Sequence, residues 1–171
     1  MLLEFVDYFN EENVMTRNHC PLCKTVVEPD VLNEMSGEEG RLSVRVYRMP
    51  ILKCSKGHRL FSNPDFPLLM LDWLAQSGTK LPVSAAKGML IKKYHCGACG
   101  EPLSEPDDRR HSFRLAVNLP DTEPFEIDLT MPVQRCAKCQ KEQVHSLKQL
   151  RNDAPAALAH AFKSAGITAG M

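Results

Sequence analysis

Seven cysteines set in closely spaced groups constrain the fold of this chain more than any other feature of its sequence. Six of them form three Cys-x-x-Cys pairs, and the seventh is followed four residues later by a histidine. The eight candidate ligands are Cys20, Cys23, Cys54, His58, Cys96, Cys99, Cys136 and Cys139. They make two tetrahedral sets of four, and closed sets of thiolate and imidazole are typical of structural zinc. The sequence therefore predicts two zinc ions per chain.

The order of the ligands along the chain assigns four of them to each ion. In the second set, two Cys-x-x-Cys pairs each let a tight turn direct two sulfurs at one ion. In the first set, His58 lies one position beyond the residue that aligns with Cys139. Gly57 at the aligned position cannot ligate, so His58 is the local candidate. The alternative is an incomplete remnant site with a surface histidine.

An internal repeat surrounds these ligands. Each copy reads His-Cys-x-x-Cys, then a spacer, then Met-Pro-x-x-basic-Cys-x-Lys. The spacers between the inner cysteines are 30 and 36 residues long. Agreement at two separated blocks in the same order is hard to obtain by chance, which indicates two copies of one supersecondary unit.

The spacers are predicted to form β-hairpins. In the second copy, apolar and polar residues alternate over 113–119 and 125–131, on both sides of a loop bounded by Pro120 and Pro124. In the first copy, a strand starts at Val26-Val27, residues 37–40 form the turn, and 42–47 alternate again. Two ligand-bearing turns joined by a β-hairpin describe a zinc ribbon. The expected fold class is α+β, with two tandem zinc ribbons and short helices between them and at the C-terminus.

Three helices are expected. Pro67 and Gly78 delimit an apolar helix over 66–77, which should be buried between the ribbons or at an oligomer interface, with Trp73 in the core. A second helix is predicted over 84–91, and a third begins at Asp153 as its N-cap and ends at Gly166. Residues 167–171 should fray. The predicted domains are a first ribbon with the N-terminal segment (1–65), a connector (66–93), a second ribbon (94–145) and a C-terminal helix with its tail (146–171).

Composition limits the classes of function. Lysine and arginine equal aspartate and glutamate in number, whereas a broad nucleic-acid surface normally needs a basic excess. The N-terminal segment has no basic residue before its apolar part, so no signal peptide is predicted. No apolar run approaches the roughly 18 residues that span a bilayer. The protein is expected in the cytoplasm, where Cys-x-x-Cys pairs are metal ligands more often than disulfides.

No catalytic or cofactor-binding residue is predicted besides the metal ligands. The sequence has no Gly-rich phosphate loop, nucleophile elbow or acid–base cluster. A redox dithiol needs a pair at a helix N-terminus, whereas each pair here is followed by strand-like or polar sequence. An open catalytic zinc would have three protein ligands, and both sets here are closed. Iron in the four-cysteine set stays an alternative to zinc.

Basic and histidine residues near the ligands have simpler interpretations. Lys53, Lys56, Arg135 and Lys138 flank the outer cysteines and either touch phosphate or, as we favour, offset the negative charge of the thiolates. His19 and His95 each precede a first ligand and are expected either to support the ligands by hydrogen bonding or to be ordinary strand residues, and not to ligate. His111, His145 and His160 are expected to be ordinary surface or helix residues.

The second copy, residues 94–165, resembles the YgiT-type zinc finger, the zinc ribbon of a class of bacterial toxin–antitoxin antitoxins. The resemblance lies in Cys96-Gly-Ala-Cys99, the hairpin, the stretch from Met131 to Cys139 and the helical segment that follows. It implies structural zinc and contact with a partner protein. In that family a separate helix-turn-helix domain binds DNA, and the roughly 30 residues after Cys139 are too few for one.

These observations favour a non-enzymatic zinc-binding adaptor that mediates protein–protein interaction. Its partner, or a second copy of the chain, would dock on the apolar helix 66–77 or on the C-terminal helix, and no membrane contact is expected. One alternative is a nucleic-acid-binding ribbon involved in regulating transcription or translation. A thiol redox or metal-handling protein is the other.

Overall fold

The computed structural model describes residues 18–89, 91–104 and 108–168, so the predictions for 1–17 and 169–171 lie outside the described residues. The elements are β1 (Val27–Glu39), β2 (Leu42–Cys54), β3 (Arg59–Phe61), α1 (Phe66–Ser77), a 3₁₀ turn (Gly78–Lys80), β4 (Ala85–Lys87), β5 (Lys93–His95), β6 (Arg110–Val117), β7 (Phe125–Arg135), β8 (Glu142–Val144), α2 (Leu147–Ser164) and β9 (Ile167–Thr168). The α+β class is thus confirmed. Within the described ranges, no helix has the length and apolar character needed to cross a bilayer.

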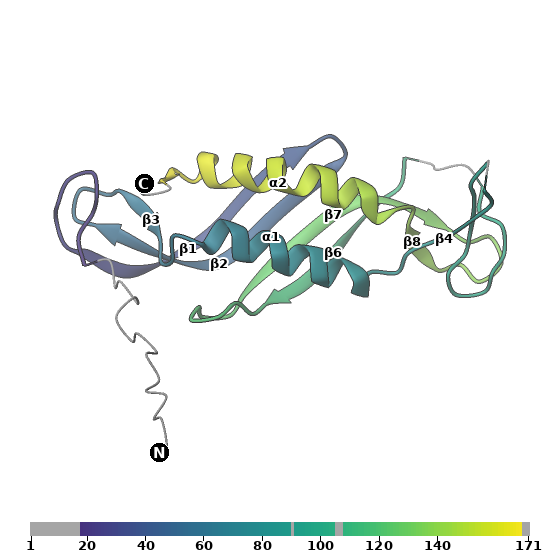
Figure 1. The fold of residues 1–171 in the computed structure, drawn as a ribbon, viewed down its shortest axis with the longest axis horizontal. Helices are drawn as coiled ribbons and strands as arrows, with labels where there is room; N and C mark the ends of the chain where they lie inside the picture. Colours follow the sequence, from purple (N-terminus) through teal and green to yellow (C-terminus); the bar gives the residue numbers. More distant parts are fainter. Residues whose placement is uncertain (1–17, 90, 105–107, 169–171) are drawn as a thin grey trace, which may run out of the picture.

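Two antiparallel hairpins, β1–β2 and β6–β7, form the centre of a seven-stranded sheet (Figure 1). They join edge to edge, because β2 pairs antiparallel with β7 over Ser43–Tyr47 and Glu126–Thr130. β3 pairs with the end of β2, β8 pairs with the end of β7, and β9 lies parallel to β3. The predicted domain boundaries stay predictions, and the sheet itself runs across them.

The two hairpins meet through segments that the predicted repeat aligns with each other. Arg45 pairs with Asp128, while Ile127, the repeat counterpart of Arg45, pairs with Val46. The segments that follow are also placed alike: Leu52 of β2 pairs with Leu60 of β3, and the counterpart of Leu52, Gln134 of β7, pairs with Gln143 of β8. Each half therefore has a hairpin followed by a ligand-bearing turn and a short third strand.

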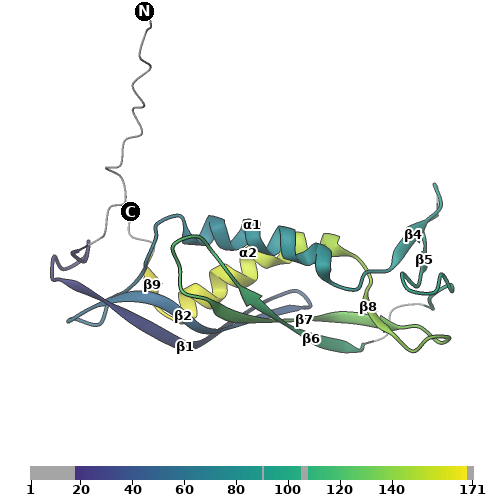
Figure 2. The ribbon, with the colours of Figure 1, turned by 90° about the horizontal axis from the view of Figure 1, so that it is seen from below.

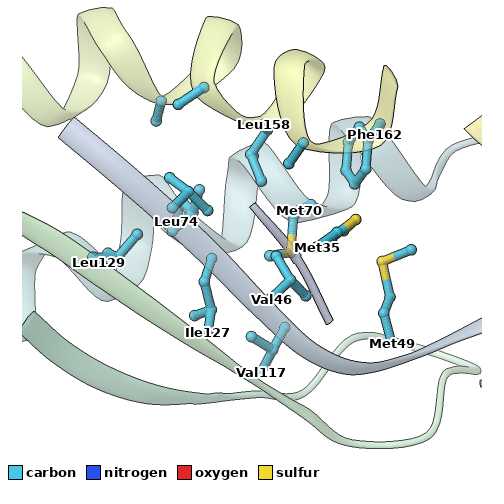
Figure 3. Close-up of a cluster of buried hydrophobic side chains, with 14 of the residues drawn as sticks. Met35, Val46, Met49, Met70, Leu74, Val117, Ile127, Leu129, Leu158 and Phe162 are labelled. Atoms are coloured by element: carbon cyan, nitrogen blue, oxygen red, sulfur yellow. The ribbon is translucent and has the colours of Figure 1, made fainter. Parts of the chain in front are cut away.

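Both helices lie on one face of the sheet (Figure 2). The predicted bounds of α1 are confirmed, with Pro67 in its first turn and Gly78 as its C-cap. Phe66, Met70 and Leu74 of α1 are buried, and Trp73 packs against the core from a partly buried position. Strand side chains meet the helices in this layer, as Figure 3 shows for Val46, Ile127 and Leu129 beneath Met70, Leu74, Leu158 and Phe162. Burial of these side chains holds the two hairpins and the helix layer together.

α2 crosses β1 at unusually short range, which corrects the predicted turn. Residues 37–40 were expected to turn, but β1 continues through Glu39 and the turn lies at Gly40-Arg41. Gly37 is instead a strand residue beneath the helix, where an added Cβ would lie 2.1 Å from the carbonyl oxygen of Ala157. The helix can approach this closely because Gly37 has no side chain.

Three further predictions are wrong in detail. α2 begins at Leu147, not after Asp153, because the Ser146 hydroxyl accepts the Lys148 N–H as an N-cap; Pro155 lies inside the helix. The helix predicted over 84–91 is absent from its described residues, where β4 forms instead: Ser84 donates its N–H to the Val144 carbonyl and so draws the chain into an extended path. Ile167 and Thr168, expected to fray, form β9.

A polar cluster joins β6, β7 and β2 through Arg114, Asp128 and Tyr47. Arg114 binds both carboxylate oxygens of Asp128, with N–O distances of 2.8 and 2.9 Å, and Tyr47 donates its hydroxyl to the same carboxylate at 3.0 Å. The Arg114 guanidinium also lies 5.0 Å from the centre of the Tyr47 ring. The hydrogen bonds from Arg114 lower the pKa of Asp128. The ionised Asp128 carboxylate on β7 therefore links β6 and β2.

Candidate metal centres

The eight predicted ligands lie in two groups at opposite ends of the sheet. The Cys20–Cys23 turn precedes β1, Cys54 ends β2, and His58 directly precedes β3. The second group comes from the turn after β5 and from the turn between β7 and β8. Because β2 and β7 are antiparallel, their C-terminal ends point in opposite directions, which separates the two groups (Figure 1).

Three of the four ligand-bearing turns share one backbone pattern. Cys20 donates its N–H to the Thr25 carbonyl at 2.8 Å, and Lys24 donates its N–H to the Cys20 carbonyl at 2.8 Å. The turns that begin at Cys96 and Cys136 repeat both bonds at the same spacing. In each turn the fourth residue after the first cysteine has a positive φ: 61° at Lys24, 76° at Gly100 and 60° at Gln140. This common shape directs both cysteines of a pair to the same side.

The fourth turn closes one residue earlier, which explains the displaced histidine. Gly57 donates its N–H to the Cys54 carbonyl at 2.8 Å, and Cys54 donates its own to the His58 carbonyl at 3.1 Å. Gly57, which aligns with Cys139, therefore has φ 84°, a conformation that L side chains rarely adopt. The next residue, His58, supplies the fourth donor instead.

In the first cluster the donor atoms lie at contact distance from one another. Nδ1 of His58 is 3.5 Å from the Cys20 sulfur and 3.4 Å from the Cys54 sulfur, and the sulfurs of Cys23 and Cys54 are 3.6 Å apart. All four donor atoms lie within 4.8 Å of one another. The structure therefore brings His58 into the set, against the alternative of a remnant site with a surface histidine.

The second cluster has the same dimensions. The sulfurs of Cys96 and Cys139 are 3.6 Å apart, as are those of Cys99 and Cys136. A disulfide would need about 2.05 Å, so none is formed. Metal–sulfur bonds of about 2.3 Å in a tetrahedron place sulfurs about 3.8 Å apart, and a sulfur and an imidazole nitrogen about 3.5 Å apart. Both donor sets fit one tetrahedral ion each.

Apolar packing and one hydroxyl set the electrostatics of the first cluster. Cys20 and Cys54 are buried with Val27 and Leu60, and this burial raises the pKa of the Cys20 thiol. At Cys23, the Thr25 hydroxyl 3.0 Å away lowers the thiol pKa to about 7. At Cys54, burial opposes ionisation, but hydrogen bonds that include the backbone N–H groups of His58 and Lys56 leave the pKa lowered.

In the second cluster a side-chain amide, that of Gln143, favours ionisation of a thiol. Its Oε1 accepts the Gly97 N–H at 2.8 Å, and its side-chain amide is the main cause that lowers the pKa of Cys96 to about 6. Backbone hydrogen bonds, led by the Cys139 N–H, lower the pKa of Cys136. At Cys99 the Glu101 N–H favours the thiolate, but burial and the neighbouring thiols raise the pKa to about 12. Four thiols this close ionise together when a cation offsets their charge.

Gln143 and Leu60 occupy corresponding positions in β8 and β3, because each pairs with the repeat-aligned residue of the preceding strand. The chain therefore has an apolar residue beside the Cys20 sulfur and a buried amide beside the Cys96 sulfur. Neither Thr25 nor Gln143 was singled out from the sequence. The available signal for Gln143 was a polar residue at a position that the first copy fills with leucine.

The flanking residues pair mostly with neighbouring side chains. Lys53 lies 3.7 Å from Asp30, Arg135 lies 3.0 Å from Glu142, and Lys138 lies 3.4 Å from Glu101. None of His19, His95, His111 and His160 belongs to either donor cluster of the described residues. His145 was expected to be an ordinary surface residue; instead its ring is partly buried, lies 3.6 Å from the Tyr94 ring between centres and has Nδ1 2.8 Å from Gln134 Oε1.

No protein-family model, curated protein or solved structure matches this chain. The resemblance to the YgiT-type finger therefore has no family match behind it and stays an expectation from the sequence. What the fold and the clusters define is an α+β protein with two groups of cysteine and histidine, each geometrically able to hold one metal ion.

Proposed function

We propose that this chain is a non-enzymatic zinc protein built as two tandem zinc ribbons. The observation that carries the proposal is the pair of four-donor clusters with tetrahedral spacing, one in each half of the sheet. Zinc is favoured because it accepts both the Cys₃His and the Cys₄ donor sets in closed tetrahedral sites. Each set offers four protein ligands, which is the number typical of structural zinc sites.

Each of the two ions would cross-link ligand-bearing turns at one end of the sheet. Each cluster joins turns that are distant in the sequence, such as Cys23 and Cys54 or Cys99 and Cys136. Structural zinc contributes on the order of 10–16 kcal/mol of apparent binding free energy in finger peptides. The central hydrophobic layer lies between α1, α2 and the sheet, so the ends depend on the clusters more than the middle does.

The helix layer is the surface that we propose for the adaptor role. A hollow of about 260 Å³ lies between α1 and α2, lined mostly by apolar residues that include Leu71, Ala75 and Leu147. Leu68, also on α1, is 64% exposed. An apolar side chain of a partner protein would fit this hollow, and the neutral net charge of the chain favours recognition by packing.

Metal content tests the zinc proposal. Protein purified without added metal should contain two zinc ions per chain by mass spectrometry of the elements, and His58→Ala should retain one tightly held ion. Chelation should remove the far-ultraviolet circular dichroism of the end strands. Iron in place of zinc at the four-cysteine cluster, or fewer than two bound ions in fully folded protein, would contradict the assignment.

A matched pair of variants tests the adaptor role. Ala75→Glu places a carboxylate in the hollow, whereas Ala159→Glu places one on an exposed position of α2 outside it. Both changes keep a helix-forming residue, so neither should unfold the protein. Partners captured from native cells by wild type and by Ala159→Glu should be lost with Ala75→Glu. Equal capture by all three proteins would refute docking in the hollow.

A further inference from the structure

A cavity lined by three cationic side chains lies between the β4–β5 hairpin and the N-terminal end of α2. Its volume is about 420 Å³. The hairpin is anchored there by two bonds from Ser84: its N–H donates to the Val144 carbonyl at 3.0 Å, and its hydroxyl donates to the His145 carbonyl at 2.6 Å. The walls of the cavity therefore come from elements that are fixed to one another.

The charged residues lining this cavity are Lys92, Lys148 and Arg151, and its lining includes no carboxylate. In the described part of the chain, none of the three forms an ion pair, whereas Lys53, Arg135 and Lys138 beside the metal clusters each do. Asp153 lines an adjoining cavity that shares Lys148 with this one, and Asp72 lines the hollow that shares Arg151. Three cations that form no ion pair around one hollow attract an anion, and the first turn of α2 adds the positive end of its helix dipole.

His145 also lines this cavity, and the hydrogen bonds around its ring define which nitrogen carries the proton. The Ser104 carbonyl accepts from Gln134 Nε2 at 2.6 Å, which fixes the orientation of the Gln134 amide. Gln134 Oε1 then faces Nδ1 of His145 at 2.8 Å, so Nδ1 carries the proton and donates. In the neutral imidazole Nε2 is left as an acceptor, and burial lowers the pKa of His145 and keeps it neutral.

We infer that this cavity binds an oxyanion of the phosphate class, held by Lys92, Lys148 and Arg151, with a P–OH group donating to Nε2 of His145. The requirement for a hydroxyl on the anion separates candidate ligands. Inorganic phosphate keeps at least one P–OH at neutral pH, and a phosphate monoester keeps one in part, because its second pKa is about 6. Sulfate has none at this pH, and the phosphodiesters of a nucleic-acid backbone have none either.

Calorimetric titration of the zinc-loaded full chain with inorganic phosphate and with sulfate, at equal ionic strength, tests the inference. Phosphate should bind saturably at one site, and sulfate about tenfold more weakly because it would place two acceptors against each other. Adenosine monophosphate and adenosine form a second arm, which separates a monoester site from a site for free phosphate. Tighter binding of adenosine monophosphate than of inorganic phosphate would indicate a site for phosphate monoesters. Tighter binding of inorganic phosphate would indicate a site for free phosphate.

Charge variants on α2 supply the controls. Arg151→Gln and Lys148→Gln should each weaken phosphate binding about tenfold or more, since each removes a charge-assisted bond. Lys163→Gln removes the same charge from an exposed position in the last turn of the same helix and should leave the affinity unchanged. Three results would each overturn the inference. They are the absence of saturable binding up to about 10 mM phosphate, an equal loss of affinity in all three variants, and binding of sulfate as tight as that of phosphate.

Discussion

Replacing Gln143 with leucine should weaken the second metal centre and leave the first unchanged. The substitution gives the second cluster the residue that the first already has at the corresponding position of β3, Leu60. It removes the amide that favours the Cys96 thiolate and the acceptor of the Gly97 N–H. Leucine has a similar volume, so packing around the 3% exposed side chain should change little.

The size of the effect follows from the amide group that is lost beside Cys96. Gln143 Nε2 is buried without a hydrogen-bond partner among the described residues, so it is available to donate to the Cys96 thiolate, and a hydrogen bond to a charged group contributes about 1.5–3 kcal/mol. Each 1.4 kcal/mol is about tenfold in an equilibrium constant, which gives a roughly 10- to 150-fold weaker second site. Loss of hydrogen bonds to metal ligands typically weakens metal affinity by about 10–100-fold, which is the same range.

Competition with a chromophoric zinc chelator measures the effect. Wild type should release its two ions in two steps, and Gln143→Leu should move one step to lower chelator concentration. Repeating the titration in a His58→Ala background identifies the moved step as the four-cysteine cluster. Gln149→Leu, a glutamine-to-leucine change on α2, serves as the control. An unchanged release curve, or an equal shift of both steps, would refute the role assigned to Gln143.

Three other changes test the fold and the first cluster. Gly37→Ala should lower stability by about 1–3 kcal/mol or more through overpacking, seen as a fall in Tm, because its Cβ would lie 2.1 Å from the Ala157 carbonyl oxygen; an unchanged Tm would mean that α2 does not lie this close. Asp128→Asn should reduce the steepness of acid unfolding: the folded-state pKa of Asp128 is lowered, so its stabilisation is present above the unfolded pKa, about 3.9, and is lost as pH falls through the lowered value. Identical acid-unfolding curves for the two proteins would contradict this. Gly57→Ala should weaken the first site by straining a residue at φ 84°, whereas Ser55→Ala in the same turn should not; equal zinc retention by the two variants would argue against the turn geometry.

Features with local sequence signals were predictable. The bounds of α1 follow from Pro67 and Gly78, and the β6–β7 hairpin follows from alternation around a proline-bounded loop. The ligand groups follow from spacing, and even the displaced His58 was identified as the local candidate. Such signals lie within a few residues of one another, so they do not depend on contacts with distant parts of the chain.

Features decided by distant contacts were not predictable. Alternation shows which face of a strand is buried but not which strand lies beside it, so the β2–β7 junction has no sequence signature. β4 is extended because the residue before it, Ser84, donates its N–H to the carbonyl of Val144, which lies far along the chain. The start of α2 did have a local signal, since Ser146 and Gln149 have capping-box spacing, but Asp153 with Pro155 gave a competing one.

The antiparallel junction of β2 with β7 joins two hairpins of one chain edge to edge, as a sheet that continues across a dimer interface joins two subunits. Each hairpin alone would expose the edge of its second strand, and an open edge invites pairing with another chain. Here the two edges cover each other over Ser43–Tyr47 and Glu126–Thr130, so the same contact that joins the hairpins also leaves neither of these edges open to another chain. One half of the chain produced separately should therefore form a homodimer. Adding the other half should replace this homodimer with a complex of the two halves.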